Sequence, residues 1–258
     1  MISFYKANSI GNTIGVIPDQ ENGISWTPEC VRLFCGKRWG IDCDQMMVMG
    51  PKVDIWNRNG TQAKACGNGM RCIIAVLKKK EDIQPLQMNG PVGIVEGWRQ
   101  SDDQISILQG NVSVGTMQNI KNPPHTIFFQ DIGLEGIPVH VGNPHAVIMH
   151  APPDNLSPEW QPTHPFFPTG VNVSFVSSVN DTFFVQTWER GVGRTLSCGS
   201  GACAVAATLH AKGKVGQTVT LHTPGGIIHL HSTVRGWVHT APAHIIAKGY
   251  WFFPENVQ

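Results

Sequence analysis

The sequence predicts an α+β fold of two similar halves, each a curved, largely antiparallel, barrel-like sheet around a central helix, related by pseudo-twofold symmetry. Three observations support this prediction. The chain has 258 residues, enough for two domains of about 130 residues each. A Cys-Gly-x-Gly motif occurs twice, at residues 66–69 and 198–201. Each copy precedes an apolar helix-like stretch and then short strand-like runs, so the same order of parts occurs twice.

The two helix-like stretches cover residues 70–77 and 202–211. Both are apolar nearly all round, which is typical of helices enclosed by other elements. Lys78-Lys79-Lys80 follows the first stretch, and Lys212-Gly213-Lys214 follows the second. Lysines suit the negative end of a helix, and Gly213 is predicted as the residue that stops the second helix. The strand-like runs after the helices lie at residues 92–96, 105–108, 219–222, 227–230 and 234–239.

The predicted halves are residues 1–115 and residues 116–247, and a C-terminal tail, about 248–258, is expected to return to the first half. Pro123-Pro124 lies near the boundary between them. A proline-rich segment at residues 152–168 reads as ordered surface, because Trp160, Phe166 and Phe167 within it need a place to pack.

Composition excludes several classes of protein. The formal net charge is +1, charged residues make up 14% of the chain, and no basic stripe is present, so we expect no nucleic-acid partner. No signal peptide and no apolar run of about 18 residues is found, which predicts a cytoplasmic protein with no membrane partner.

The seven cysteines are an odd number spread along the chain, which fits a reducing compartment. Without CxxC pairs or a His-Glu-x-x-His motif, no metal site is expected.

The repeated motif places Cys66 and Cys198 each at the start of a helix. A helix N-terminus lowers a thiol pKa, and its backbone N–H groups bind anions. Two such thiols in equivalent positions suit inversion at a carbon centre, in which one group removes a proton and the other donates one to the opposite face. The sequence therefore predicts an amino-acid racemase or epimerase that needs no cofactor.

The remaining cysteines read differently. Cys72 and Cys203 fall inside the apolar helices and are interpreted as buried core residues. The other three lack the glycine context and read as structural or incidental: Cys30, Cys35 and Cys43. For Cys66 and Cys198 themselves, the alternative is that both are small buried apolar residues.

Five ordered blocks of the chain resemble the diaminopimelate epimerase family. Residues 57–72 are similar to its Asn-x-Asp-Gly-Ser-Glu and Cys-Gly-Asn-Gly-x-Arg-Cys signature. Residues 188–203 are similar to its Glu-Arg-Gly-x-Gly-Glu-Thr and Cys-Gly-x-Gly-Ala-Cys signature. The other blocks are Gly11-Asn12, residues 142–145 (Gly-Asn-Pro-His) and residues 164–173. The resemblance implies the fold predicted above and epimerisation of LL-2,6-diaminopimelate to the meso form, a step of lysine and peptidoglycan precursor synthesis.

The resemblance also implies roles for individual residues. Cys66 and Cys198 would be the acid–base pair, and backbone N–H groups of Gly67, Asn68, Gly199 and Ser200 would hold the substrate carboxylate. The pocket would be lined by Asn12, Gln45, Asn57, Asn143, Asn172, Glu189 and Arg190. Arg190 suits a carboxylate and Glu189 an ammonium group. We further hypothesise that His145 and Glu189 tune the thiols, each near one cysteine; for His145, the alternative is a structural histidine.

Four acidic positions of the family are changed here, to Thr13, Asn59, Gln62 and Arg194. None of the four carries the proton, so the chemistry is retained while the support of the pocket changes. Three alternatives stay open: a racemase of another amino acid, of the proline, hydroxyproline or histidine type; a cysteine hydrolase with one thiol activated by His145; and a binding module without activity. The only expected partner is a small amino-acid substrate, and a homodimer is an open option.

Overall fold

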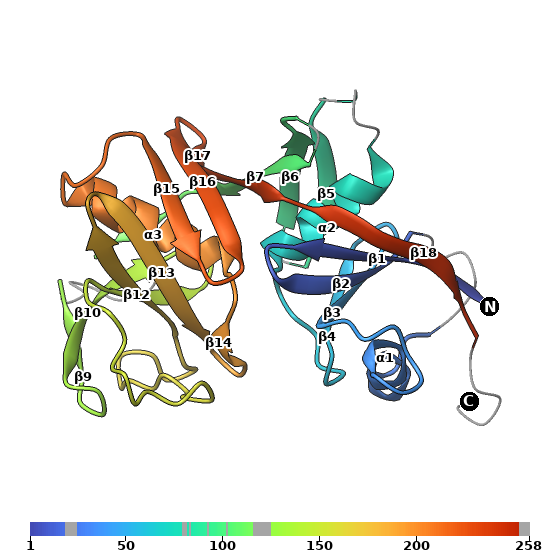
Figure 1. Ribbon diagram of the computed structural model, residues 1–258, viewed down its shortest axis with the longest axis horizontal. Coiled ribbons are helices and arrows are strands. Elements are labelled where there is room, and N and C mark those ends of the chain that lie inside the picture. Colours follow the sequence, from blue (N-terminus) through green and yellow to red (C-terminus); the bar gives the residue numbers. More distant parts are fainter. Residues whose placement is uncertain are drawn as a thin grey trace. The chain divides into compact units, whose positions relative to one another are not determined.

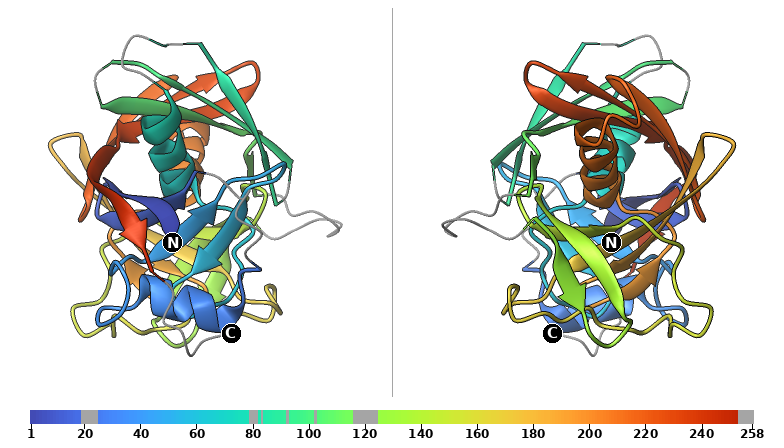
Figure 2. Two further views of the ribbon diagram at one scale, coloured as in Figure 1. Left: turned by 90° about the vertical axis from the view of Figure 1, so that its right-hand side faces the viewer. Right: turned by 90° about the vertical axis from the view of Figure 1, so that its left-hand side faces the viewer.

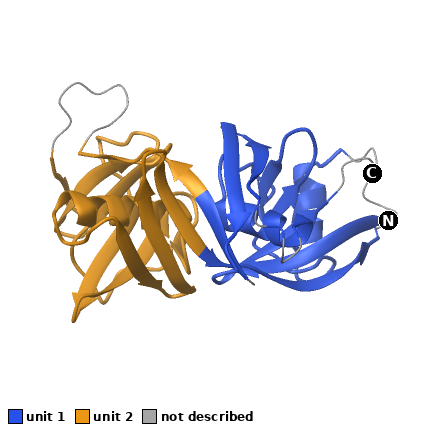
Figure 3. Cartoon of the chain, turned by 90° about the horizontal axis from the view of Figure 1, so that it is seen from above, with its two compact units in different colours: residues 1–107, 241–258 blue, residues 108–240 orange. Residues whose placement is uncertain are grey.

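The structure is a computed structural model that describes residues 1–18, 25–78, 82, 84–91, 93–101, 103–115 and 125–252. The chain divides into two compact units, residues 1–107 with 241–258 (unit 1) and residues 108–240 (unit 2) (Figures 1 and 3). The division expected from the sequence, after residue 115, stays a prediction. Pro123-Pro124 and Lys79-Lys80 lie outside the described residues.

Unit 1 contains a five-stranded sheet. Its strands, in spatial order, are β18 (His244–Trp251), β1 (Ile2–Ser9), β2 (Asn12–Ile17), β3 (Gln45–Val48) and β4 (Asp54–Asn57). Neighbours are antiparallel except β2 and β3, which are parallel and are separated in the sequence by α1 (Pro28–Cys35). Three further strands lie in the order β5 (Leu86–Gly90), β6 (Gly93–Arg99) and β7 (Gln104–Gly110).

Helix α2 (Gly67–Leu77) lies in the core of unit 1 and contacts β1, β2, β3, β6 and β18. One core cluster joins Ile73 of α2 to Ile14, Met47 and Ile105 of the strands. The opposite face of the five-stranded sheet is covered by α1, where Phe34 and Trp251 lie in a second cluster. Successive strand residues point to opposite faces, so β3 is apolar on both sides and supplies residues to both clusters.

Unit 2 has an open sheet around α3 (Gly199–Ala211). Its strands are β8 (Ser113–Val114), β9 (Ile127–Phe129), β10 (Leu134–His140), β11 (Pro144–Ile148), β12 (Asn172–Val179), β13 (Thr182–Glu189), β14 (Gly193–Thr195), β15 (Thr218–Thr223), β16 (Gly226–Thr233) and β17 (Gly236–Pro242). The spatial order is β17, β16, β15, β13, β12, β11, β10, β8, with β14 on β13 and β9 on β10. Parallel pairs are β11 with β12 and β13 with β15. Helix α3 contacts β8, β10, β11, β12 and β16; Figure 2 shows α2 in its left view and α3 in its right view.

The two units repeat one order of parts. In unit 1 a parallel pair, β2 with β3, is followed by the hairpin strand β4, then α2 and three successive strands. In unit 2 the parallel pair is β11 with β12, followed by the hairpin strand β13 and the short β14, then α3 and three successive strands after it. The predicted fold class is therefore confirmed, although the sheets are open and do not close into barrels.

The helix and strand boundaries follow local signals. Helix α3 ends at the predicted stop: Gly213 has φ +67°, and Lys214 N–H donates to the Leu209 carbonyl at 2.9 Å. The last predicted run, 234–239, corresponds to β17, which begins at Gly236 because the preceding residues form the turn. In that turn the Arg235 N–H donates to Thr233 Oγ1 at 3.1 Å.

The proline-rich segment is ordered surface, as predicted. The Trp160 ring lies 6.3 Å from the Phe129 ring and 6.3 Å from the Trp188 ring. Its Nε1 donates to Asp131 Oδ2 at 2.7 Å, and the Trp188 indole donates to the Ser157 carbonyl at 2.9 Å. The segment therefore closes one side of the unit 2 core.

Candidate active site in two half-sites

Each candidate thiol caps the helix that it precedes. Cys66 Sγ accepts a hydrogen bond from Gly69 N–H at 3.1 Å, and Cys198 Sγ accepts one from Gly201 N–H at 3.4 Å. Both cysteines have extended backbones, as N-cap residues do. The first N–H groups of α2 and α3 have no acceptor inside the helix, so each turn offers donors to an anion beside a sulfur atom.

The last glycine of each motif is required by what lies against the helix. A Cβ on Gly69 would approach Met47 Sδ to 2.5 Å. A Cβ on Gly201 would lie 3.0 Å from Ser174 Oγ, on the strands beneath the helix. Close packing of strand on helix therefore explains why glycine occupies both positions.

The half-site of unit 1 is a chain of amide side chains that ends on Cys66. The Cys66 thiol donates to Gln45 Oε1 at 2.8 Å, and Asn12 Nδ2 donates to the same oxygen at 3.2 Å. Gln45 Nε2 in turn donates to Asn57 Oδ1 at 2.9 Å. Asn57 Nδ2 donates to Thr61 Oγ1 at 3.1 Å. Four side chains predicted for the pocket are thus brought together: Asn12, Gln45, Asn57 and Cys66.

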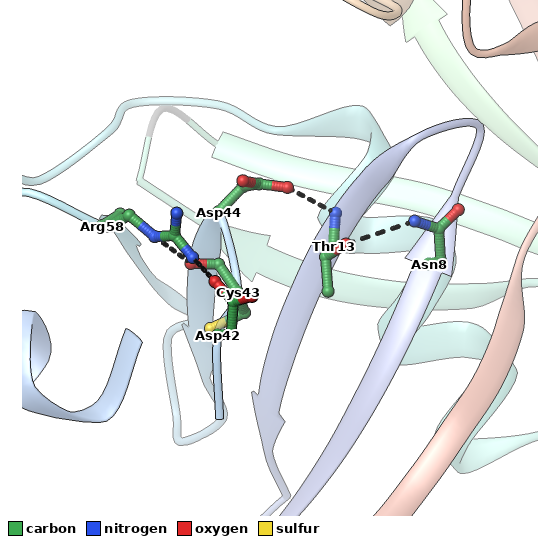
Figure 4. Close-up of polar contacts among 6 residues, drawn as sticks. All are labelled: Asn8, Thr13, Asp42, Cys43, Asp44 and Arg58. Carbon is green, nitrogen blue, oxygen red and sulfur yellow. Dashed lines mark hydrogen bonds and ion pairs between the residues drawn. The ribbon is translucent and has the colours of Figure 1, made fainter. Parts of the chain in front are cut away.

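A second set of contacts holds the loop before Gln45 (Figure 4). Asp44 accepts the Thr13 N–H at 2.9 Å, and Asn8 Nδ2 lies 3.4 Å from Thr13 Oγ1. Arg58 donates from Nε to the Cys43 carbonyl at 2.8 Å and forms an ion pair with Asp42. Asp44 thus supplies a carboxylate at Thr13, one of the changed acidic positions.

The half-site of unit 2 places His145 next to the cap of α3. His145 Nε2 lies 3.1 Å from Ser200 Oγ and 3.1 Å from Asn143 Oδ1. Ser200 Oγ lies 3.5 Å from Cys198 Sγ, so the imidazole reaches the thiol only through the serine hydroxyl. Asn172 Nδ2 lies 3.4 Å from the same ring nitrogen. Burial, together with the charge of His140, lowers the pKa of His145 to about 3, so the ring is neutral at physiological pH.

Glu189 gives the second thiol an acidic neighbour. Burial raises the pKa of Cys198 well above its usual range, and the negative charge of Glu189 adds to this. The lowering expected at a helix start comes from the Gly201 N–H and is outweighed. Burial also raises the pKa of Glu189, against the effect of hydrogen bonds from Thr195 and Cys198. Thr195 Oγ1 donates to Glu189 Oε1 at 2.7 Å and fixes the carboxyl group. Within unit 2, therefore, Glu189 is a direct neighbour of Cys198, and His145 reaches the same thiol through Ser200. The hypothesis had placed each of these two residues near a different cysteine.

Arg190 contacts the other site residues of unit 2 through its backbone, and its guanidinium points to a loop. Its N–H donates to Asn172 Oδ1 at 2.9 Å, which ties it to the half-site. Its guanidinium is exposed and donates to the Thr169 carbonyl at 2.9 Å. In this structure the charged group is therefore held by the loop before β12.

The sheet repeat explains why these side chains gather. In unit 1, Gln45 begins β3 and lies directly opposite Asn57 at the end of β4. In unit 2, Asn172 begins β12 and Glu189 ends β13, the corresponding places. Paired strands place these terminal residues next to each other at one end of the sheet. Residues that are distant in sequence therefore lie together near the N-terminus of the central helix of their unit.

Arg71 is a functional candidate whose role the sequence alone does not predict. It is fully buried in α2, donates from Nε to Ser9 Oγ at 3.0 Å and also donates to Asn68 Oδ1. Asn68 supplies one of the N–H groups expected to bind a carboxylate. The signal was present in the first motif, where Arg71 stands five residues after Cys66, but only the tertiary contacts show that its guanidinium holds Ser9 and Asn68.

The other cysteines are core residues in the structure. Cys72 and Cys203 are fully buried in α2 and α3, and burial raises the pKa of the Cys72 thiol. All seven cysteines of the chain are free thiols. In the described part of the chain no three His, Cys, Asp or Glu side chains are arranged to hold a metal ion. The arrangement suits proton transfer by a thiol beside an anion-binding helix end.

Comparison with known proteins adds a family match. The family model described as diaminopimelate epimerase matches residues 4–115 and 137–245. The diaminopimelate epimerase of Bartonella quintana is 30% identical over 270 residues, which cover 95% of this chain and 91% of that protein. That of Thioalkalivibrio sulfidiphilus is 30% identical over 272 residues, covering 96% of this chain and 95% of the relative.

Solved structures with the same fold are more distant in sequence. A probable proline racemase from Agrobacterium radiobacter has a TM-score of 0.70 at 15% identity, covering all of this chain (100%) and 94% of that one. A hydroxyproline epimerase from Agrobacterium vitis has a TM-score of 0.66 at 16% identity, covering 96% of this chain and 90% of that one. At such identities the likeness establishes the fold alone.

Proposed function

Because this chain belongs to the diaminopimelate epimerase family, we propose that it interconverts LL- and meso-diaminopimelate without a cofactor, using Cys66 and Cys198 as acid and base. The observation that carries the proposal is that both sulfur atoms cap equivalent helices beside backbone N–H donors. Amino-acid inversion needs these two elements, a pair of proton carriers and donors for the developing enediolate.

The reaction balances with two thiols. One thiolate removes the α-proton, and the electron pair moves into the substrate carboxylate to give an enediolate. The other thiol donates its proton to the opposite face of the carbon. After one turnover the protonation states of the two sulfur atoms are exchanged, and the return reaction restores them.

The surroundings of Cys198 support an assignment of which thiol acts first as the acid. Burial and the Glu189 carboxylate keep the pKa of Cys198 high, so Cys198 starts as the protonated thiol. Cys66 then takes the role of the starting base, for which its thiol must first lose the proton that it donates to Gln45. The N–H groups of Gly67, Asn68, Gly199 and Ser200 hold the reacting carboxylate, as N-terminal helix donors hold anions.

The remaining site residues recognise the far end of the substrate. The amides of Asn12, Gln45, Asn57, Asn143 and Asn172 supply donors and acceptors. Glu189 suits the ammonium group and Arg190 a carboxylate. For Arg190 this requires its guanidinium to leave Thr169, to which it donates in the structure.

The hydrolase alternative is less well supported. A cysteine hydrolase needs an imidazole in contact with its thiol. Within unit 2, His145 contacts Ser200 instead, and its pKa is lowered to about 3. A neutral, buried ring of this kind is suited to orienting a hydroxyl group.

The compartment proposed is the cytoplasm. All seven cysteines are free thiols, which fits a reducing environment. In the described part of the chain no helix has the length and apolar character of a membrane span.

Proton exchange in D2O tests the function. Purified protein is incubated with LL-diaminopimelate, and NMR follows loss of the α-proton signal and appearance of the meso isomer. Proline, hydroxyproline and histidine are run in parallel. We expect exchange with diaminopimelate, and a loss of roughly 10²–10⁴-fold in Cys66→Ala and in Cys198→Ala.

Matched controls separate the site thiols from the core thiols. Cys203→Ala, in the interior of α3, is expected to retain activity. Exchange with another amino acid and none with diaminopimelate would assign the chain to the racemase alternative. Full activity in both Cys66→Ala and Cys198→Ala would refute the two-thiol mechanism.

A further inference from the structure

We infer that His239 is a positioning residue of the unit 2 half-site, which holds Gly199 so that its N–H faces the substrate carboxylate. The inference rests on the proposed function, since it assigns a role within that site. His239 lies outside the Cys-Gly-x-Gly motifs and is distant in sequence from Cys198.

The observation is a ring packed against the first residue of α3. His239 lies on β17 and is fully buried. A Cβ built on Gly199 would meet its ring, at 3.0 Å from Cε1, 3.3 Å from Nε2 and 3.5 Å from Nδ1. All three atoms lie at similar distances, so the imidazole covers the α-carbon of Gly199.

Glycine at position 199 is explained by this ring. The backbone of Gly199 is not in the left-handed region that favours glycine. No conformational need therefore selects glycine there, whereas a side chain would press on a buried ring. His239 and Gly199 are thus a matched pair.

The ring is held in turn by its strand. His239 lies opposite Leu230 of β16 in antiparallel register, and Leu230 is buried as well. A ring that is enclosed in this way cannot move aside cheaply.

The consequence is that several contacts hold the Cys198–Gly199 turn. Cys198 Sγ accepts the Gly201 N–H at 3.4 Å. The His239 ring covers Gly199, and His145 contacts the same turn through Ser200. A small displacement of donors at a reacting centre is costly, so the ring sets how well the first N–H of α3 meets the carboxylate.

A double-mutant cycle tests the pair. Gly199→Ala, His239→Ala and the double variant are compared with the wild type in diaminopimelate epimerisation. We expect Gly199→Ala to raise KM roughly tenfold in the wild-type background and less than about threefold in the His239→Ala background. His239→Ala alone is expected to raise KM by roughly tenfold with a smaller change in kcat.

Ile127→Ala is the control for a merely structural effect. Ile127 is buried in the unit 2 cluster that packs around Phe129 and Trp188, and that cluster contains no residue of α3. The Ile127→Ala variant should lower the thermal midpoint as the His239→Ala variant does, yet leave KM unchanged. If Ile127→Ala raised KM equally, or if the effects of Gly199→Ala and His239→Ala simply multiplied, the positioning role would be refuted.

A second measurement does not depend on the substrate. The rate at which iodoacetamide alkylates Cys198 is followed by peptide mass spectrometry in the same four proteins. We expect Gly199→Ala to change this rate more in the wild-type background than in the His239→Ala background. An epimerase-inactive wild type that still shows this coupling would refute the proposed function and leave the His239–Gly199 contact intact. An active wild type without coupling would refute the His239 inference alone.

Discussion

At the scale of the residue, the chemistry depends on what surrounds each sulfur atom. Cys66 contacts two amide side chains, those of Gln45 and Asn12. Cys198 has a carboxylate, Glu189, and a serine hydroxyl. Two thiols that occupy equivalent helix caps are therefore unequal in charge environment, and the difference can be measured at single residues.

Glu189→Gln should lower the pKa of Cys198. The substitution removes a negative charge that disfavours the thiolate, which is worth about 1–3 pKa units for a near neighbour. The pH dependence of Cys198 alkylation, read by peptide mass spectrometry, measures the change. Glu159→Gln, which alters an exposed carboxylate of the same unit, should leave it unchanged. An unchanged or higher Cys198 pKa in Glu189→Gln would contradict the charge argument.

His145 should make the protein less stable in acid. Its pKa is lowered from 6.5 to about 3 in the folded protein, so below pH 6.5 the unfolded chain binds a proton that the folded one does not. The free energy of unfolding should fall by up to about 1.4 kcal/mol per pH unit as the pH drops from roughly 6 toward 4. Urea denaturation of wild type and His145→Gln at several pH values tests this. Parallel pH dependence in both proteins would show that His145 does not carry the effect.

At the scale of the element, a glycine of each central helix packs closely against a side chain of a neighbouring strand. Gly69 lies on Met47 of β3, and Gly201 lies on Ser174 of β12. The cap, the adjacent N–H donors and the helix position are therefore linked. We therefore expect a larger residue at either glycine to displace the sulfur together with the helix.

Gly69→Ala should cost about 1–3 kcal/mol of stability and lower kcat/KM. The added Cβ would meet Met47 Sδ at 2.5 Å, and Met47 is fully buried. Gly216→Ala is the matched control, because a Cβ there meets no atom within 4 Å. Thermal denaturation and epimerisation kinetics of both variants give the comparison. Equal behaviour of the two variants would show that the helix tolerates displacement.

At the scale of the molecule, unit 1 is formed by two segments of the chain, residues 1–107 and 241–258, and unit 2 by the residues between them. The return strand β18 pairs with β1, Ile2 opposite Trp251. Trp251 packs edge-on against Phe34 at 5.3 Å between ring centroids and donates from Nε1 to the Trp39 carbonyl at 2.9 Å. The end of the described chain thus completes the core of the unit that holds Cys66.

Trp251→Ala should destabilise unit 1 by about 3–5 kcal/mol, the cost of a large cavity in a core. Tyr250→Ala, one residue earlier and 59% exposed, should change stability by less than about 0.5 kcal/mol. Hydrogen exchange measured by mass spectrometry shows where backbone amides lose protection in Trp251→Ala. We expect this loss of protection in β1, β2 and α1. If the two variants were equally stable, β18 would not be part of the unit 1 core.

Local signals predicted some elements and missed others. The two central helices and Gly213 were predictable, because caps, glycines and apolar stretches act within a few residues. Helix α1 was not anticipated, although Thr27 before Pro28 is an N-cap signal and its Oγ1 accepts the Cys30 N–H at 3.3 Å. Strand β3, Gln-Met-Met-Val, is buried on both faces and has no alternating pattern to detect.

The sequence by itself determined that two thiols begin two similar helices, since the Cys-Gly-x-Gly motif is local and repeated. Its resemblance to one family also named the pocket residues before any contact was known. Tertiary structure alone decided that Glu189 lies next to Cys198 and that His145 reaches this thiol through Ser200. It also decided that Asp44 accepts the Thr13 N–H and that the His239 ring covers Gly199. The physical reason is range: caps and helix stops depend on neighbours in the chain, whereas strand register and core packing join residues far apart in sequence.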